Sequence, residues 1–505
     1  MALAQLHAGA VDGVDGYLVT VEVDRYQPDN GTGRTTVVGL PDAAVRESIE
    51  RVTPALFNSG CNPRPSDHIV INLAPADRRK EGPAFDLAIA LGLIATMEEI
   101  PPLPADTMFC AELALDGALR PIKGLLSMAL AARAAGLRRM VVAPKNSDEA
   151  AVVDGLEVVA PRNLRHLLRD LKGEQALAAV PSPVPNRTQP DGPDLEDVRG
   201  QIHAKRALEI AAAGGHNLLM IGPPGSGKTM IARRLPSILP TMNLDEALDA
   251  TRVHSVAGLL GDSGLLRIRP FRAPHHNVSA VGLIGGGSVP RPGEVSLAHR
   301  GVLFLDELPE YPRPVLESLR QPLEDGHLTI SRSGGRLKFP ARCMLIAAMN
   351  PCPCGYLGHP TRACSCSQDR ILRYRSRISG PLLDRIDIHL EVPAQKPETI
   401  DASEAGENSC TVRQRVEAAR DRMLHRQGSA NAMLDPGPLR RHAQPMPEAR
   451  TLLHQAIEEL GLSARAHDRI RKVARTIADL DDSAEVTLEH VSEAIGYRLL
   501  DRQVW

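Results

Sequence analysis

Apolar residues recur in two different patterns along this chain. Short, continuous apolar runs occupy 217–221, 302–305 and 344–348. Continuous rather than alternating apolar character is typical of strands buried on both faces of a parallel sheet. Later stretches repeat apolar residues at the spacing of amphipathic helices. These stretches are 412–426, 448–460, 464–478 and 488–499. The pattern predicts a parallel α/β segment followed by a small helical bundle.

The first third of the chain mixes both patterns. Residues 69–71 and 141–143 are short strand candidates, and 84–95 is a long apolar stretch with helical character. Residues 127–135 are rich in alanine, and Gly136 follows them as a typical helix end. Strands and helices in one segment predict a layered α/β or α+β domain.

Two changes in composition divide the chain. The proline-rich stretch 181–193 is typical of an extended linker, and 393–410 is polar and acidic. A chain of 505 residues is long enough for about three domains. We therefore expect an α/β multidomain protein with an N-terminal domain at 1–175, a linker at 176–194, a central α/β domain at 195–395, a linker at 396–410 and a helical C-terminal domain at 411–505.

Charge and composition exclude several classes of protein. Lys and Arg number 59 against 61 Asp and Glu, which argues against a uniformly basic coat for nucleic acid. Aromatic residues make up 3%, too few for a platform on which single-stranded bases stack. Residues 1–12 lack the pattern of a signal peptide, and the apolar run 87–97 is too short to cross a bilayer. We expect a cytoplasmic protein without a membrane association.

A phosphate-binding loop follows the first strand of the central segment. The motif is Gly222-Pro223-Pro224-Gly225-Ser226-Gly227-Lys228-Thr229. It has the Walker A spacing and stands between a strand and a helix at 230–235, as such a loop requires. Backbone N–H groups turn inward around phosphate oxygens, and the helix N-terminus favours their negative charge. We expect Lys228 to reach the β- and γ-phosphates of ATP and Thr229 to bind Mg²⁺.

The strand at 302–305 ends in two acids, as a Walker B motif does. Asp306 is expected to hold Mg²⁺ through water, and Glu307 to polarise the attacking water as a general base. The third strand leads to Asn350, which fits a polar sensor between the nucleotide and Walker B. The alternative for Asn350 is a turn residue before Pro351.

Arg385 lies in the stretch 382–387, which contains two aspartates. It is either a local salt-bridge partner of Asp384 or Asp387, or an arginine finger that neutralises charge on the γ-phosphate of a neighbouring subunit. The residues alone leave the two alternatives open.

Basic residues and cysteines form two further clusters. Arg332, Arg336 and Lys338 flank a hairpin turn at Gly334-Gly335, which is either a solvated basic hairpin or a contact for a phosphate backbone.

Four thiols also fall within fifteen residues, in a loop rich in glycine and proline. They are Cys352, Cys354, Cys364 and Cys366. The cluster predicts a structural Zn²⁺ site with tetrahedral coordination, and the alternative is a loop with free thiols.

Across nearly its whole length the chain resembles the YifB/ComM family of magnesium-chelatase-like AAA+ ATPases. The residues that carry the resemblance are 38–42, 200–201, the loop 222–229, 302–307, 350–355, 382–388 and 463–465. The resemblance implies Arg385 as arginine finger, Arg465 as sensor 2 and a homo-hexameric ring. Segment 285–294 resembles the helix-2 insert of this branch, and 331–338 resembles its pre-sensor-1 hairpin. In a ring, six such hairpins would line the pore with positive charge.

The N-terminal segment resembles Lon-type proteases and their ribosomal S5 domain 2-like fold. Residues 80–86 are similar to the segment that carries the catalytic serine, and 121–132 to the segment that carries the catalytic lysine. Ala84 and Met128 stand at those two positions. Because a Ser–Lys dyad needs a hydroxyl and an amine, the domain is expected to be inactive as a protease.

The resemblance implies an ATP-driven motor acting on single-stranded or branched DNA. Its activity would be helicase and branch migration in recombination and natural transformation. The alternative is chelatase-type remodelling of a protein partner, because magnesium chelatase subunits share this AAA+ branch. An ATP-dependent protease is a third hypothesis, which Ala84 and Met128 oppose.

Overall fold

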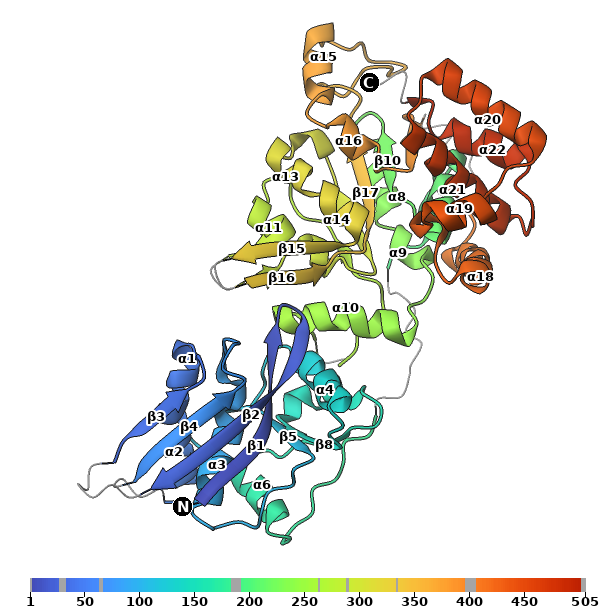
Figure 1. Ribbon diagram of the computed structural model, residues 1–505. Coiled ribbons are helices and arrows are strands. Elements are labelled where there is room, and N and C mark those ends of the chain that lie inside the picture. Colours follow the sequence, from blue (N-terminus) through green and yellow to red (C-terminus); the bar gives the residue numbers. More distant parts are fainter. Residues whose placement is uncertain are drawn as a thin grey trace. The chain divides into compact units, whose positions relative to one another are not determined.

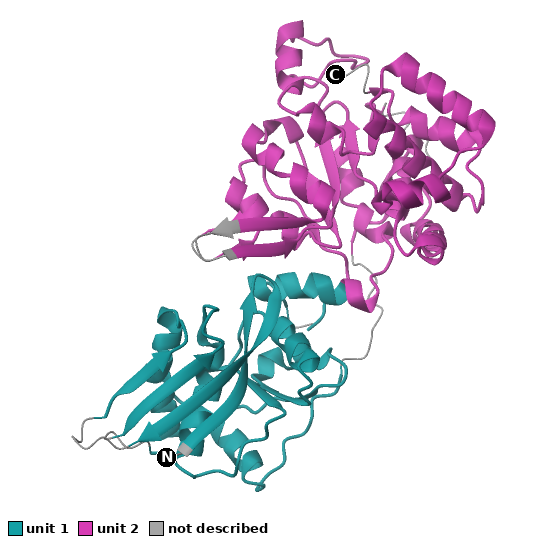
Figure 2. Ribbon diagram, in the orientation of Figure 1, with its two compact units in different colours: residues 1–186, 247–266 teal, residues 187–246, 267–505 magenta. Residues whose placement is uncertain are grey.

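The computed structural model describes residues 2–26, 33–62, 67–182, 192–261, 264–287, 290–332, 335–395 and 406–500. The chain forms two compact units (Figure 2). Unit 1 contains residues 1–186 and 247–266, and unit 2 contains residues 187–246 and 267–505.

Unit 1 is built on a seven-stranded mixed sheet with the order β3-β4-β2-β1-β5-β8-β9 (Figure 1). The strands are β1 (Ala2–Asp12), β2 (Asp15–Tyr26), β3 (Thr35–Val38), β4 (His68–Ala74), β5 (Thr107–Cys110), β8 (Arg139–Val142) and β9 (Glu157–Val159). β1 and β2 form a long antiparallel hairpin in which Asp12 pairs with Asp15. Its helices are α1 (Ala43–Arg46), α2 (Ser48–Asn58), α3 (Asp86–Thr96), α4 (Leu125–Ala134), α5 (Ser147–Ala151) and α6 (Leu164–Leu171). A short antiparallel pair of strands, β6 (Glu112–Leu113) and β7 (Leu119–Arg120), also belongs to unit 1.

Two helices cover opposite faces of the β1–β2 hairpin. Successive strand residues point to opposite faces, and Leu6, Ala8 and Ala10 share a buried core with α3. Gly9 points the other way, where an added Cβ would lie 2.8 Å from the Cβ of Met128 on α4. Helix α3 also contacts α2, and nearly all of its residues are buried, which explains why α3 is apolar almost all round.

Helix α10 (Leu244–Ala257) contributes residues to unit 1, although it follows the phosphate-binding loop in the chain. Arg252 donates to the carbonyl oxygen of Val14 at 3.1 Å, and the hydroxyl of Ser255 donates to the carboxylate of Glu149. Burial raises the pKa of Glu149 even though Ser255 and Asn146 stabilise its charge. The sequence-based interpretation placed all of 195–395 in one domain, whereas 247–266 pack within unit 1. The chain therefore passes between the units three times.

Unit 2 is built on a five-stranded parallel sheet with the order β11-β14-β17-β10-β18. The strands are β10 (Leu218–Ile221), β11 (Phe271–Arg272), β14 (Val302–Leu305), β17 (Met344–Met349) and β18 (Ile388–Glu391). β10, β14 and β17 are buried along their whole length, as their continuous apolar runs predicted. Two antiparallel pairs lie outside the sheet: β12 (Gly285–Gly286) with β13 (Arg291–Pro292), and β15 (His327–Arg332) with β16 (Gly335–Pro340).

The C-terminal helices share one apolar core with this sheet. They are α18 (Ser409–Gln427), α19 (Pro436–His442), α20 (Pro447–Leu460), α21 (Ala464–Leu480) and α22 (Leu488–Gly496). The other helices of unit 2 are α7 (Ile202–Gly214), α8 (Lys228–Ala232), α9 (Leu235–Ile238), α11 (Ala280–Ile284), α12 (Glu294–Leu297), α13 (Arg313–Ser318), α14 (Arg320–Asp325), α15 (Gln368–Arg375) and α16 (Gly380–Leu383). The predicted parallel α/β segment and helical C-terminal region are confirmed. Among the described residues, no helix combines the length and apolar character needed to cross a membrane.

Candidate functional site

The predicted catalytic residues follow three neighbouring strands of the unit 2 sheet. β14, β17 and β10 lie side by side and parallel, so the segments that leave them meet at one edge. The loop 222–227 leaves β10 and ends at α8, whose first residue is Lys228. Asp306 and Glu307 leave β14, and Asn350 leaves β17. The fold therefore gathers residues that are more than a hundred positions apart.

Lys228 is buried inside its own loop. Its Nζ donates to the carbonyl oxygens of Gly222 at 2.7 Å and Pro223 at 2.8 Å. The side-chain oxygen of Asn350 lies 3.3 Å from the same Nζ. Burial lowers the pKa of Lys228 to about 8, although Asp306 nearby favours the charged form. The ammonium is thus held by neutral acceptors that phosphate oxygens can replace.

Thr229 and Asp306 form a pair of oxygen donors beside Lys228. The Thr229 hydroxyl donates to the Asp306 carboxylate at 2.6 Å. A hydroxyl and a carboxylate are ligands that suit Mg²⁺, which takes few protein ligands and completes its shell with water and phosphate oxygens. The residues present therefore fit a magnesium ion.

Glu307 has a strained backbone and an open side chain. Its φ of 53° is left-handed, which is rare for a residue with a side chain and recurs at functional sites. Its side chain is 54% exposed, and Nδ1 of His276 lies 3.5 Å from its carboxylate. The approach of His276 to Glu307 joins residues 31 positions apart, and no spacing in the sequence signals it.

The two arginines assigned by resemblance have carboxylate neighbours of their own. Arg385 is 9% exposed, forms an ion pair with Glu324 on α14 and donates to the carbonyl oxygen of Pro381 at 2.7 Å. Arg465 is well exposed at the start of α21, 4.0 Å from Asp384. Asp387, the other carboxylate offered for Arg385, is bound by Arg469. Their roles as finger and sensor stay predictions.

Arg385 also lines a cavity of about 570 Å³. Glu317, Arg320 and Glu324 from α13 and α14 line the same cavity. Arg320 is paired with Glu317 at 3.0 Å, so the cavity wall carries two ion pairs side by side. Burial lowers the pKa of Arg385, and Arg320 adds to that effect through like-charge repulsion.

The basic hairpin is an antiparallel pair, β15 with β16, but Gly335, which was predicted as a turn residue, pairs with Arg332 as the first residue of β16. Arg336 and Lys338 are exposed and lie two residues apart on β16, so they share one face. The turn residue Gly334 and the side chain of Arg332 lie outside the described part of the chain.

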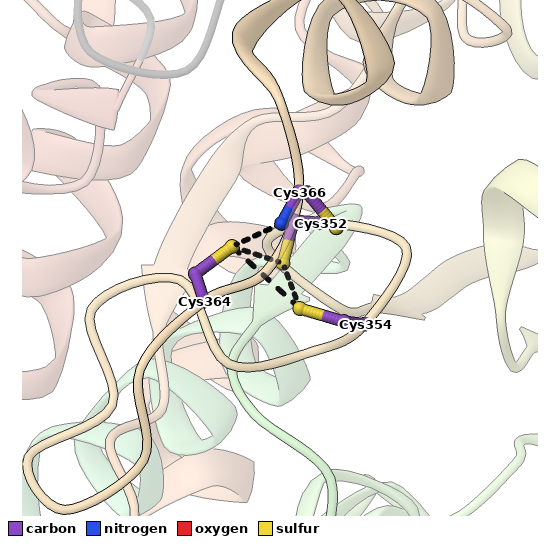
Figure 3. Close-up of side chains that lie close together, drawn as sticks. All are labelled: Cys352, Cys354, Cys364 and Cys366. Atoms are coloured by element: carbon purple, nitrogen blue, oxygen red, sulfur yellow. Dashed lines mark hydrogen bonds between the residues drawn. The ribbon is translucent and has the colours of Figure 1, made fainter.

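The four predicted cysteine ligands converge in the loop between β17 and α15 (Figure 3). Their sulfur atoms all lie within 4.8 Å of one another, an arrangement that could hold a metal ion. A backbone hydrogen bond from Tyr356 helps to lower the pKa of the Cys354 thiol to about 6. In the same cluster, burial and the thiols of Cys354 and Cys352 raise the pKa of Cys364.

Known protein families and relatives match this chain along nearly its whole length. Family models match in succession: subunit ChlI of Mg-chelatase at 21–146, magnesium chelatase subunit ChlI at 194–400 and its C-terminal part at 406–498. The uncharacterized protein YifB of Escherichia coli K12 is 44% identical over 505 residues, covering 99% of this chain and 98% of that protein. Competence protein ComM of Haemophilus influenzae is 43% identical over 509 residues, with the same coverage. The chain belongs to the YifB/ComM family of magnesium-chelatase-like AAA+ proteins. Membership implies ATPase activity with ATP and Mg²⁺.

A weaker similarity connects this chain to proteases. A stretch of 126 residues is 25% identical to Lon protease 2 of Bacillus subtilis. In unit 1, Ala84 and Met128, which stand at the expected positions of a Ser–Lys dyad, are both 4% exposed. Neither side chain carries a nucleophile or a base. The chemistry therefore predicts that the domain has no protease activity.

Proposed function

We propose that this protein is an ATP-driven motor that works as a homo-hexameric ring on single-stranded or branched DNA. The observation that carries the proposal is the convergence of Lys228, Thr229 and Asp306 in the unit that also bears an exposed basic hairpin. A relative that is 43% identical is named a competence protein, which favours a role in recombination during natural transformation.

Each residue of the site has a separate task in hydrolysis. Lys228 exchanges the carbonyl oxygens of Gly222 and Pro223 for phosphate oxygens. Thr229 and Asp306 would hold a magnesium ion, which would supply positive charge at the phosphates. Glu307, with His276 beside it, orients the attacking water and accepts its proton. Asn350 lies close enough to Lys228 to report whether a γ-phosphate is bound.

A neighbouring subunit would complete the site with Arg385. A guanidinium at the γ-phosphate stabilises the transition state and is worth about 10³-fold or more in turnover. In the isolated chain Glu324 binds Arg385, and Glu324 lies on α14, directly before β15 of the hairpin. Release of Arg385 from Glu324 would therefore couple the bound nucleotide to the position of the hairpin. Arg465 would contact nucleotide of its own subunit as sensor 2.

Arg332, Arg336 and Lys338 would contact the phosphate backbone, which is bound electrostatically and without sequence preference. DNA binding should therefore weaken steeply with salt. Substituting both Arg336 and Lys338 with alanine should reduce the salt dependence as well as the affinity.

The test is ATP-dependent migration of a synthetic three- or four-way DNA junction. We expect the parent protein to process the junction and both Lys228→Ala and Glu307→Gln to lose that activity. Normal ATP turnover without junction processing and without stimulation by DNA would overturn the motor proposal for the isolated protein.

A second candidate function is chelatase-type remodelling of a protein partner. Family models named for the magnesium chelatase subunit match 21–146, 194–400 and 406–498, which favours it. The two functions separate on one measurement, because a DNA motor should hydrolyse ATP faster when DNA is added and a remodeller of proteins should not.

A further inference from the structure

The cysteine cluster lies in a long loop with little structure of its own. Residues 351–367 connect β17 to α15 and contain neither helix nor strand. Loops of this length are uncommon inside compact domains unless they have a function or an additional constraint. Cys352 is fully buried, and the other three thiols are half-buried. The loop therefore brings its ligands together without a regular element to hold them.

The spacing of the sulfur atoms fits tetrahedral Zn²⁺. The Sγ of Cys352 lies 3.4 Å from that of Cys354 and 3.6 Å from that of Cys364, and Cys354 and Cys364 are also 3.6 Å apart. Zinc–sulfur bonds of about 2.3 Å in a tetrahedron separate the sulfur atoms by about 3.8 Å. The thiols of Cys352, Cys354 and Cys364 thus need an expansion of only a few tenths of an ångström to accommodate the ion. The Sγ of Cys366 lies within 4.8 Å of the other three.

The same loop packs directly against the phosphate-binding loop. At Gly355 an added Cβ would lie 2.5 Å from Cδ of Pro224, so the backbone of Gly355 lies close to the Pro224 ring. On its other side, Nε and Nη2 of Arg375 on α15 donate to the carbonyl oxygen of Pro351 at 3.1 and 3.0 Å. Cys352 follows Asn350 by two residues, and Asn350 contacts Lys228. The cysteine loop therefore borders the nucleotide site at two points, Pro224 and Asn350.

We propose that Zn²⁺ bound by Cys352, Cys354, Cys364 and Cys366 fixes the cysteine loop against Pro224 and Asn350, so that zinc occupancy controls nucleotide binding. The inference rests on the proposed ATPase site. Four thiolates around one ion cross-link a loop that contains neither helix nor strand. With the ion bound, Gly355 holds the phosphate-binding loop in place and Asn350 keeps its position at Lys228. Without the ion, both constraints are released together.

The first experiment measures zinc and nucleotide binding on the full-length chain. We expect elemental analysis to find one zinc ion per chain. Removing zinc with a chelator under reducing conditions should weaken binding of a fluorescent ATP analogue by about tenfold or more, and zinc sulfate should restore it. Cys354→Ser should lose the metal, whereas Cys410→Ser, which changes an exposed thiol outside the cluster, should keep it. A protein that carries no stoichiometric zinc, or iron in its place, overturns the proposal.

A matched pair of glycine variants tests the contact without touching a ligand. Gly355 has φ +82° and Gly358 has φ +76°, so alanine meets a similar backbone penalty at both. Only at Gly355 would the new Cβ meet Pro224, since nothing lies within 4 Å at Gly358. We expect both variants to keep zinc, and Gly355→Ala alone to bind the ATP analogue about tenfold more weakly.

Equal affinity in the two glycine variants would overturn the proposal, as would unchanged affinity after zinc removal. Failure of the proposed function looks different, because then the zinc-loaded parent protein itself would neither bind the ATP analogue nor hydrolyse ATP.

Discussion

Two buried lysines, one in each unit, have similar surroundings at first sight. Nζ of Lys228 in unit 2 donates to the carbonyl oxygens of Gly222 and Pro223. Nζ of Lys80 in unit 1 donates to the carbonyl oxygens of Pro75 and Arg78. Burial lowers the pKa of both side chains. By burial, charge and hydrogen bonding alone, the two would be equal candidates for a functional site.

Their neighbours separate them. Lys228 begins a helix at the ends of parallel strands, with the Thr229–Asp306 pair beside it. The backbone of Lys80 is itself tied to Leu40 and Asp42, and its segment leads to the apolar Ala84. In the proposed site, phosphate replaces the loop carbonyls at Lys228, because the expected Mg²⁺ ligands and the helix N-terminus would also favour it there. The comparison teaches that a buried cation indicates function only where its partners can be exchanged.

The largest effect is expected for the two lysines themselves. Lys228→Ala should reduce ATP turnover by about a thousandfold, because phosphate loses its only buried cation in this loop. Lys80→Ala should leave turnover per folded molecule unchanged. A coupled phosphate-release assay on both variants makes the comparison, and equal loss in the two would contradict it.

A smaller loss of activity is expected for Glu307→Gln. Removing the general base should slow turnover by about a hundredfold, while nucleotide binding through Lys228 and Thr229 persists. Single-turnover kinetics and binding of a fluorescent ATP analogue distinguish the two steps. The control is Glu310→Gln, three residues after Glu307. It removes an exposed carboxylate that pairs with Arg377. Loss of binding together with turnover would show that Glu307 supports the loop rather than the chemistry.

Stability should change at Lys80 instead. Lys80→Met leaves the carbonyl oxygens of Pro75 and Arg78 without their donor, which costs about 1–3 kcal/mol of unfolding free energy. Urea unfolding followed by circular dichroism measures the cost. Lys145→Met, at an exposed position of the same unit, should change stability little. Similar midpoints for both variants would remove the structural role assigned to Lys80.

The smallest effect is a dependence of ATP affinity on pH. In the ATP-free protein burial holds the pKa of Lys228 at about 8, below the usual 10.5. Bound phosphates raise that pKa, so the complex retains a proton that the free protein has lost. Affinity should be full below pH 8 and should fall above it, by at most about tenfold per pH unit. Calorimetry in buffers of different ionisation enthalpy should detect proton uptake on binding near pH 8, and its absence would contradict the assignment.

Local sequence was enough to predict the parts of the site that form locally. The loop 222–229 needs only the strand before it and the helix after it, and both are neighbours in the chain. The apolar runs that became β14 and β17 place Asp306 and Asn350 at strand ends by the same local logic. The C-terminal helices α18, α20, α21 and α22 were also predictable, since their periodicity reflects one buried face, whereas α19 was not predicted. Their predicted boundaries lie within a few residues of those observed.

The sequence by itself determined the chemistry of this protein: a phosphate-binding loop, two acids after a strand, a basic hairpin and four clustered thiols. Tertiary structure decided which of these groups meet. His276 beside Glu307, Glu324 on Arg385, Gly355 against Pro224 and residues 247–266 inside unit 1 all join segments that are distant in the chain. The physical reason is that such contacts depend on how strands and loops pack in three dimensions, and side-chain packing leaves no periodic signal in the sequence.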